Sequence, residues 1–234
     1  MARPLVSVIV AVLNGERFII PALQSIFTQN YAPYEVIVVD GNSVDRTAPI
    51  SQFFRSVKYI CQGGRGLACG RNTGLEAAKG ELIAFLDSDD LWLSNKLSTQ
   101  VDYLLQNPEI HYVNAWVKFF VEPGARLRPG HTKTFLDQVH VGRTPGTLLA
   151  RRSVFNLIGS FDPALSIACD VEWFKRAKDR DVPMFIIPDV LLYKRIHDRN
   201  LSSDVRTNRR EVLSLIRRTI GRQRDQKSGN SHDR

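Results

Sequence analysis

The first 90 residues alternate between short apolar runs and segments of polar or helical sequence. The apolar runs cover residues 5–13, 36–39, 57–61 and 82–86, and their aliphatic and β-branched side chains are typical of strands covered on both faces. Residues 18–27 carry apolar side chains at helical spacing. This alternation predicts an α/β fold with a mostly parallel, Rossmann-like central sheet flanked by helices, whose ligands bind at the carboxyl ends of the strands.

Capping and breaker residues predict where the helices lie. Thr47 is expected to cap a short helix with Pro49 in its first turn. The glycine-rich loop 63–66 opens a helix expected to run from about Leu67 to Ala78, and Gly80 ends it. The glycines within this helix are expected to allow close packing on the sheet.

An acidic cluster, Asp87-Ser88-Asp89-Asp90, directly follows the fourth apolar run. Carboxylates at the end of a buried strand are suitable ligands for Mg²⁺ or Mn²⁺, and the oxygens of a nucleotide diphosphate could complete the shell. The alternative interpretation is that Asp89 or Asp90 caps a helix beginning near Leu93. The position of the cluster on the sheet decides between them.

Two other polar residues, Asn14 and Asp40, also follow predicted strands and are expected to converge with Asp87. The loop after the first strand, residues 12–16, lacks the closely spaced glycines of a dinucleotide-binding turn, and a Walker A loop is absent from the sequence. We therefore expect no dehydrogenase. Arg71 and its neighbour are expected at the rim of the cleft, where an arginine can pair with a base or a phosphate.

The chain of 234 residues, 43% of them hydrophobic, is expected to form a single enlarged domain. Cys61, Cys69 and Cys169 lack the spacing of a disulfide framework or a zinc site, which favours a reducing cytosol. The first apolar run is too short to span a bilayer. A long strand is expected over residues 111–121, followed by a loop around residues 123–129 that is either a lid or an ordinary surface loop.

The net charge of +8 is concentrated near the C-terminus. Apolar residues recur at helical spacing between the arginines of residues 207–222, so this segment is either a basic helix on an anionic membrane or a terminal helix packed on the body. The sequence after Gln223 is expected to be disordered. Nucleic-acid binding is a third interpretation of the charge, but no nucleic-acid-binding motif accompanies it.

Several segments occur in an order that points to one family. They read V-S-V-I-V-A-V-L-N-G-E, then V-I-V-V-D-G-N-S-V-D-R-T, then G-L-A-C-G-R-N-T-G-L-E-A-A-K-G-E-L-I-A-F-L-D-S-D-D-L-W, and later C-D-V-E-W-F-K-R-A and Y-K-R-I-H-D-R-N-L-S. In this order they resemble family 2 glycosyltransferases of the GT-A fold, closely over about the first 95 residues and more loosely to about Ser203. The resemblance implies a nucleotide-binding half at residues 1–108, an acceptor half at residues 109–205, and a basic helix with a tail at residues 206–234.

The resemblance also implies roles for individual residues. Asp40 and Arg71 would contact the base of a nucleotide such as uridine, and Asp87 would lie on the ribose side. Asp89 would hold Mg²⁺ or Mn²⁺, and His197 would close on the metal or the diphosphate. Val12, Asn14 and Ser88 would complete the nucleotide-sugar site.

The remaining role, that of catalytic base, would fall to Asp170. In an inverting transfer one carboxylate takes a proton from the acceptor while a cation neutralises the leaving group on the opposite face. Asp170 could instead be the N-cap of the helical run 171–178 and is expected to stay ionised there. His197 is either a surface-loop residue or, with Lys194 and neighbouring arginines, part of a cationic lid.

The expected function is transfer of one sugar from a nucleotide diphosphate sugar, of which UDP is the preferred carrier, to an acceptor hydroxyl with inversion, in cell-surface polysaccharide or glycolipid synthesis. Lipid-linked acceptors and contact with the inner face of the membrane are expected partners of a cytoplasmic enzyme, and nucleic acid is not. The chain departs from the family pattern at Ala11, Leu13 and Cys169, and it lacks the Q-x-x-R-W segment of processive polymerases. The alternatives are a sugar nucleotidyltransferase and a non-catalytic nucleotide-sugar-binding protein.

Overall fold

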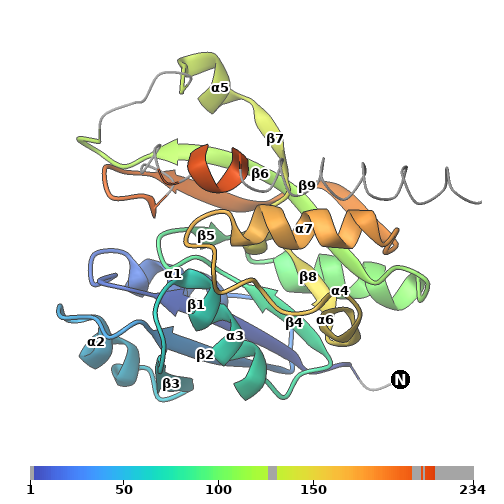
Figure 1. The fold of residues 1–234 in the computed structure, drawn as a ribbon, viewed down its shortest axis with the longest axis horizontal. Helices are drawn as coiled ribbons and strands as arrows, with labels where there is room; N and C mark the ends of the chain where they lie inside the picture. The colour runs from blue at the N-terminus through green and yellow to red at the C-terminus, as the bar shows by residue number, and fades with distance from the viewer. Residues whose placement is uncertain (1–2, 126–130, 202–206, 208, 214–234) are drawn as a thin grey trace, which may run out of the picture.

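The computed structural model describes residues 3–125, 131–201, 207 and 209–213. Its N-terminal half contains the predicted parallel sheet, with the strand order β3-β2-β1-β4 (Figure 1). The strands are β1 (Val6–Val12), β2 (Tyr34–Asp40), β3 (Val57–Cys61) and β4 (Leu82–Phe85). The strands β2, β1 and β4 are adjacent, so the residues that follow them lie together at one edge, as the alternation predicted.

The strands that follow β4 in the sequence extend the same sheet in the order β8-β6-β9-β5, with β7 paired to β6. These strands are β5 (Leu91–Trp92), β6 (Tyr112–Val121), β7 (Val139–Gly142), β8 (Leu149–Arg151) and β9 (Met184–Ile196). β8 runs antiparallel to both β4 and β6, whereas β6 and β9 run parallel. The long β9 therefore returns from the second half and brings its last residues towards the acidic loop.

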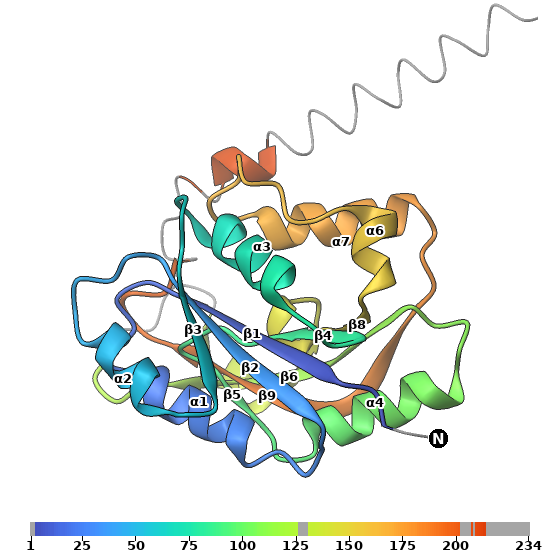
Figure 2. The same ribbon diagram turned by 90° about the horizontal axis from the view of Figure 1, so that it is seen from below.

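Helices cover both faces of the sheet, as Figure 2 shows from below. One face is packed by α1 (Ile19–Phe27), α2 (Thr47–Phe53) and α4 (Lys96–Gln106). The other face is packed by α3 (Leu67–Ala77), α6 (Ser153–Ile158) and α7 (Cys169–Asp179). A short helix, α5 (Lys133–Asp137), lies beside β7, and a 3₁₀ turn covers Pro145–Thr147.

Helix α3 lies close against the sheet because of its glycines, as predicted. A Cβ atom at Gly74 would lie 2.3 Å from the Ile9 side chain, and one at Gly70 would lie 3.2 Å from Ala11 Cβ. The close approach matters for the site, because Arg71 on the same helix points across to the acidic loop.

Three predicted helix starts were wrong. α2 has Arg46 at its N-cap position, and the backbone N–H of Thr47 donates a hydrogen bond to Oδ1 of Asp45 at 2.9 Å. α4 begins only at Lys96, after the short strand β5, so neither aspartate of the acidic loop caps it. α7 begins at Cys169 with Ala168 as its N-cap, which places Asp170 inside the first turn rather than at the cap.

Most of the basic C-terminal segment and the predicted disordered tail lie outside the described residues. Within the described part, Thr207 and residues 209–213 are helical and lie beside α7 (Figure 2). Part of the predicted lid loop, residues 126–130, is also outside the described residues. No helix among the described residues has the length and apolarity needed to cross a membrane.

Candidate functional site

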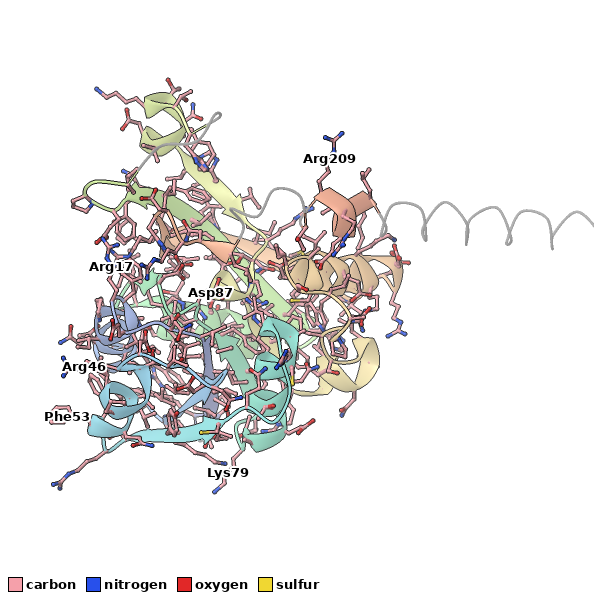
Figure 3. All side chains as sticks on the ribbon, turned by 60° about the vertical axis from the view of Figure 1, so that its left-hand side comes forward. Arg17, Arg46, Phe53, Lys79, Asp87 and Arg209 are labelled. Carbon is pink, nitrogen blue, oxygen red and sulfur yellow. The ribbon has the colours of Figure 1, made fainter. Side chains whose placement is uncertain are left out.

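The acidic loop turns sharply after β4, where the N–H of Asp90 donates to the carbonyl of Asp87 at 3.1 Å. Asp87 is labelled near the middle of the view in Figure 3. The side chains of Asp87 and Asp89 are 23% and 24% exposed, whereas that of Asp90 is 1% exposed. Two carboxylates therefore face accessible space, and the third supports the loop from beneath.

Asp87 is held by two cations from different elements. The Arg71 guanidinium from α3 donates to Oδ1 at 2.8 Å, and the Lys194 ammonium from β9 donates to Oδ2 at 3.3 Å. Burial acts to raise the pKa of Asp87, but Lys194 and Arg71 outweigh it and lower the pKa to about 2. Asp87 is thus an ionised carboxylate of fixed orientation.

Asp90 shares the same lysine. Lys194 Nζ lies 3.1 Å from Asp90 Oδ2, and the backbone N–H of Arg195 donates to Oδ1 at 2.8 Å. Burial raises the pKa of Asp90 to about 7 against the attraction of Lys194, and the charges of Asp89 and Asp87 add to the rise. The ammonium therefore bridges two carboxylates, and its own pKa is raised by Asp90 and Asp87 in spite of burial.

The residues that follow β9 form hydrogen bonds with the carboxylate of Asp89. His197 Nε2 and the Asn200 amide both lie at Oδ2, at 2.9 and 3.0 Å. The N–H of Arg199 donates to His197 Nδ1 at 3.2 Å, which places the ring proton on Nε2, facing the carboxylate. The imidazole packs on Phe18 from the loop before α1, with ring centroids 4.5 Å apart.

This arrangement could bind a divalent cation through the carboxylate of Asp89. The described partners of the Asp89 carboxylate meet Oδ2, which leaves Oδ1 open for a hard cation whose other ligands would come from phosphate and water. His197 would have to give up its hydrogen bond to coordinate through Nε2. The described residues contain no group of three or more His, Cys, Asp or Glu side chains arranged to hold a metal ion by themselves.

Asp170 is connected to this cluster through Arg71. The Arg71 side chain is 3% exposed, and its Nη1 lies 3.6 Å from the sulfur of Cys169, the residue before Asp170. Burial raises the pKa of Asp170, while Arg71 and the N–H of Val171 oppose the rise. We expected the helix N-terminus to dominate, but burial does, and a raised pKa makes Asp170 a stronger base than that expectation implied.

The loops after β1 and β2 form the other side of the site. The Asn14 side chain accepts a hydrogen bond from the N–H of Val44 at 2.9 Å, and Asn14 adopts a left-handed φ of 52°. A Cβ atom at Gly15 would lie 2.4 Å from the side chain of Val12 and 3.4 Å from Ser88 Oγ. Val12, Asn14 and Ser88 are thus brought together around a glycine whose missing side chain lets the first loop approach the acidic loop.

Asp40 is placed differently from the expected base contact. It is 1% exposed, and both of its oxygens have protein partners. The N–H of Ser43 donates to Oδ1 at 2.8 Å, and the Tyr59 hydroxyl donates to Oδ2 at 2.7 Å. Arg71 and Asp40 therefore organise the walls of the site in this structure, and their contact with a base stays a prediction.

Sequence reasoning placed Lys194 and Arg195 in a cationic lid over a diphosphate, but the structure pairs them with protein carboxylates. Arg195 forms an ion pair with Glu122, a residue that sequence analysis missed, and its guanidinium lies over the rings of Phe18 and Phe120. Asn200 was also missed. The one feature of the sequence that could have pointed to Asn200 was the frequency of polar residues after β9. This feature does not reveal which residues they contact across the sheet.

Comparison with known proteins agrees with these features. The sequence profile described as Glycosyl transferase family 2 matches residues 7–164. An uncharacterized glycosyltransferase of Rickettsia typhi is 30% identical over 208 residues, which are 83% of this chain and 65% of that protein. The Escherichia coli protein WfgD, a UDP-Glc:alpha-D-GlcNAc-diphosphoundecaprenol beta-1,3-glucosyltransferase, is 41% identical over 106 residues, 44% of this chain and 42% of its own length. The chain thus spans less than two thirds of these relatives.

Solved structures share the fold. S. aureus TarS 1-349 in complex with UDP-GlcNAc has a TM-score of 0.68 at 22% identity, covering 85% of this chain and 60% of that one. The mannosyltransferase PcManGT from Pyrobaculum calidifontis, in complex with GDP-Man and Mn²⁺, has a TM-score of 0.65 at 24% identity over 86% of this chain and 60% of that one. The fold is therefore of the GT-A type, and the chain belongs to glycosyltransferase family 2.

Proposed function

We propose that this protein transfers a single sugar from a UDP-linked donor to a lipid-linked saccharide acceptor, with inversion at the anomeric carbon. The observation that carries the proposal is the link made by Arg71, which joins the ionised Asp87 to Cys169, the residue before Asp170 at the start of α7. The two carboxylates that the reaction requires, one for the donor and one for the acceptor, are thus held in one fixed unit. The activity of WfgD supports a UDP-sugar and a diphosphoundecaprenol-linked acceptor as the substrate classes.

In this proposal Asp170 accepts the proton of the acceptor hydroxyl, because its pKa is raised by burial and no cation pairs with it directly among its described contacts. Asp87 and the loop around Asn14 position the nucleoside. Asp89 would hold Mg²⁺ or Mn²⁺ through its Oδ1 atom, and such a cation would supply positive charge that stabilises the leaving diphosphate. The Mn²⁺ in the PcManGT complex supports this choice of ion.

The donor site is tested by calorimetric titration with UDP. We expect binding in the presence of Mn²⁺ and a loss of most affinity after EDTA or in Asp89→Ala, because the single carboxylate and the diphosphate need each other to complete the shell. UDP affinity that is indifferent to both changes would exclude Asp89 as the metal ligand.

The acceptor side is tested by Asp170→Asn. We expect kcat to fall by about 10²- to 10⁴-fold, because the amide cannot accept a proton, while UDP affinity stays unchanged. Proton NMR of the product measures stereochemistry, and an α-linked donor should give a β-linked product. Wild-type turnover in Asp170→Asn would place the base elsewhere.

A further inference from the structure

The described C-terminal helical residues are attached to the loop that leads into α7. The Glu211 carboxylate accepts hydrogen bonds from the backbone N–H groups of Ser166, Ile167 and Ala168, each at 2.9 Å. Glu211 is 7% exposed, and its neighbour Val212 packs against the core cluster that contains Trp173 of α7. By contrast, Arg209 and Arg210 on the same segment are exposed.

These three N–H groups need an acceptor from outside their own loop. α7 has no side-chain cap of its own, since its N-cap is Ala168. Consecutive N–H groups at a helix N-terminus form a site for an anion, and Glu211 supplies one from 43 to 45 residues further along the chain. Burial acts to raise the pKa of Glu211, but the three N–H donors outweigh it and lower the pKa, so the carboxylate is ionised in this contact.

Asp170 lies two residues after Ala168, which carries the last of these N–H groups. Cys169 between them is fully buried and contacts Arg71, so the backbone from Ser166 to Asp170 is held from the C-terminal segment on one side and from α3 on the other. We propose that Glu211 is a positioning residue for Asp170. It fixes the start of α7 so that the Asp170 carboxylate faces the acceptor, and the inference rests on the proposed role of Asp170 as base.

The test compares Glu211→Gln and Glu211→Ala with Glu109→Gln, at an exposed glutamate in the loop after α4, in the full chain. In Glu211→Gln one carboxylate oxygen is replaced by an NH₂ group, which cannot accept a hydrogen bond from the backbone N–H groups of residues 166–168. We therefore expect the loop to loosen. We expect kcat to fall roughly ten-fold or more while UDP affinity stays within about two-fold, because displacement of a reacting group affects chemistry rather than donor binding. Glu109→Gln should match the wild type.

Two further measurements separate positioning from general stability. Hydrogen exchange across residues 163–170 should accelerate in both Glu211 variants, and acetate or formate should restore part of the turnover of Glu211→Ala by occupying the N–H cluster. Unchanged exchange, unchanged kcat, or a loss of UDP affinity in parallel with kcat would each overturn the inference. Full turnover in Asp170→Asn would instead reject the base assignment, and exchange would still report on the Glu211 contact.

Discussion

At the scale of single residues, the site is an arrangement of carboxylates whose charges are divided among a few cations. Lys194 bridges Asp87 and Asp90, Arg71 forms a second ion pair with Asp87, and the His197 ring forms a hydrogen bond with Asp89. This pairing stabilises the acidic loop, because buried or half-buried carboxylates are costly unless they are paired.

Removal of the bridging lysine tests this pairing. In Lys194→Met, Asp90 is left buried without a counter-charge, so we expect a loss of about 2–4 kcal/mol of the free energy of unfolding at pH 8. The loss should shrink towards pH 6, because Asp90, whose pKa is already raised to about 7, then takes up a proton in the folded state. Urea unfolding at both pH values measures it. The double variant Lys194→Met/Asp90→Asn is the control, and a loss that does not depend on pH would contradict the account.

Asp87 makes the opposite pH-dependent contribution. Its pKa falls from 3.8 to about 2 on folding, so its ionised form contributes about 2 kcal/mol of stability above pH 4, and this contribution is lost as the pH falls towards 2. We therefore expect the stability difference between the wild type and Asp87→Asn to decline from pH 6 to pH 3 in urea titrations. A constant difference would show that the ion pairs with Arg71 and Lys194 do not stabilise the fold.

At the scale of elements, the site depends on how closely α3 and the first loop approach the sheet. Gly74 lets α3 lie against β1, and Gly15 lets the β1–α1 loop lie against the acidic loop. Since Arg71 is one turn of α3 before Gly74, the depth at which this helix packs sets the reach of the guanidinium towards Asp87.

A glycine substitution tests the packing of α3. In Gly74→Ala the new methyl group would lie 2.3 Å from Ile9, so we expect a loss of about 1–3 kcal/mol and weaker UDP binding as Arg71 is displaced. Gly63→Ala is the matched control, since a Cβ atom there meets no described atom within 4 Å. Thermal unfolding and UDP calorimetry give the two readouts. Equal behaviour of the two variants would contradict the argument.

The elements of the first half could be predicted because their signals are local. Apolar runs and glycines placed β1 to β4 and α3 to within about two residues, and the strand ends identified Asn14, Asp40 and Asp87. The partners of those residues could not be predicted, because Lys194, Asn200 and Glu211 lie far along the chain. Only the return of β9 beside β5 and β6 brings the first two to the acidic loop. The alternative interpretation of Asp170 as an N-cap failed because the helix starts at Cys169, two residues before the predicted start at residue 171.

At the scale of the whole molecule, one sheet runs through both halves (Figure 1). The acidic loop connects β4 to β5 and so precedes the second half of the chain. The C-terminal helical residues lie beside α7 on the outside of this body. Glu211 and Val212 face the protein while Arg209 and Arg210 are exposed, which agrees with the interpretation of a packed terminal helix and leaves the arginines available to an anionic surface.

Membrane attachment is tested without disturbing Glu211. Replacement of Arg209, Arg210, Arg217 and Arg218 by glutamine should weaken co-sedimentation with anionic vesicles, by about 1 kcal/mol for each arginine near the surface, and physiological salt should reduce the effect. Neutral vesicles are the control. Equal pelleting of the wild type and the fourfold variant would assign the segment to packing alone.

The most direct test of the account is the mass spectrum of products formed from a panel of nucleotide sugars and a diphosphate-linked lipid saccharide. The account predicts that one donor, a UDP-sugar, adds the mass of one sugar to the acceptor and releases UDP, and that Asp170→Asn abolishes both products. Formation of a nucleoside diphosphate sugar from a nucleoside triphosphate and a sugar phosphate, or tight UDP-sugar binding with no product from any donor, would contradict it.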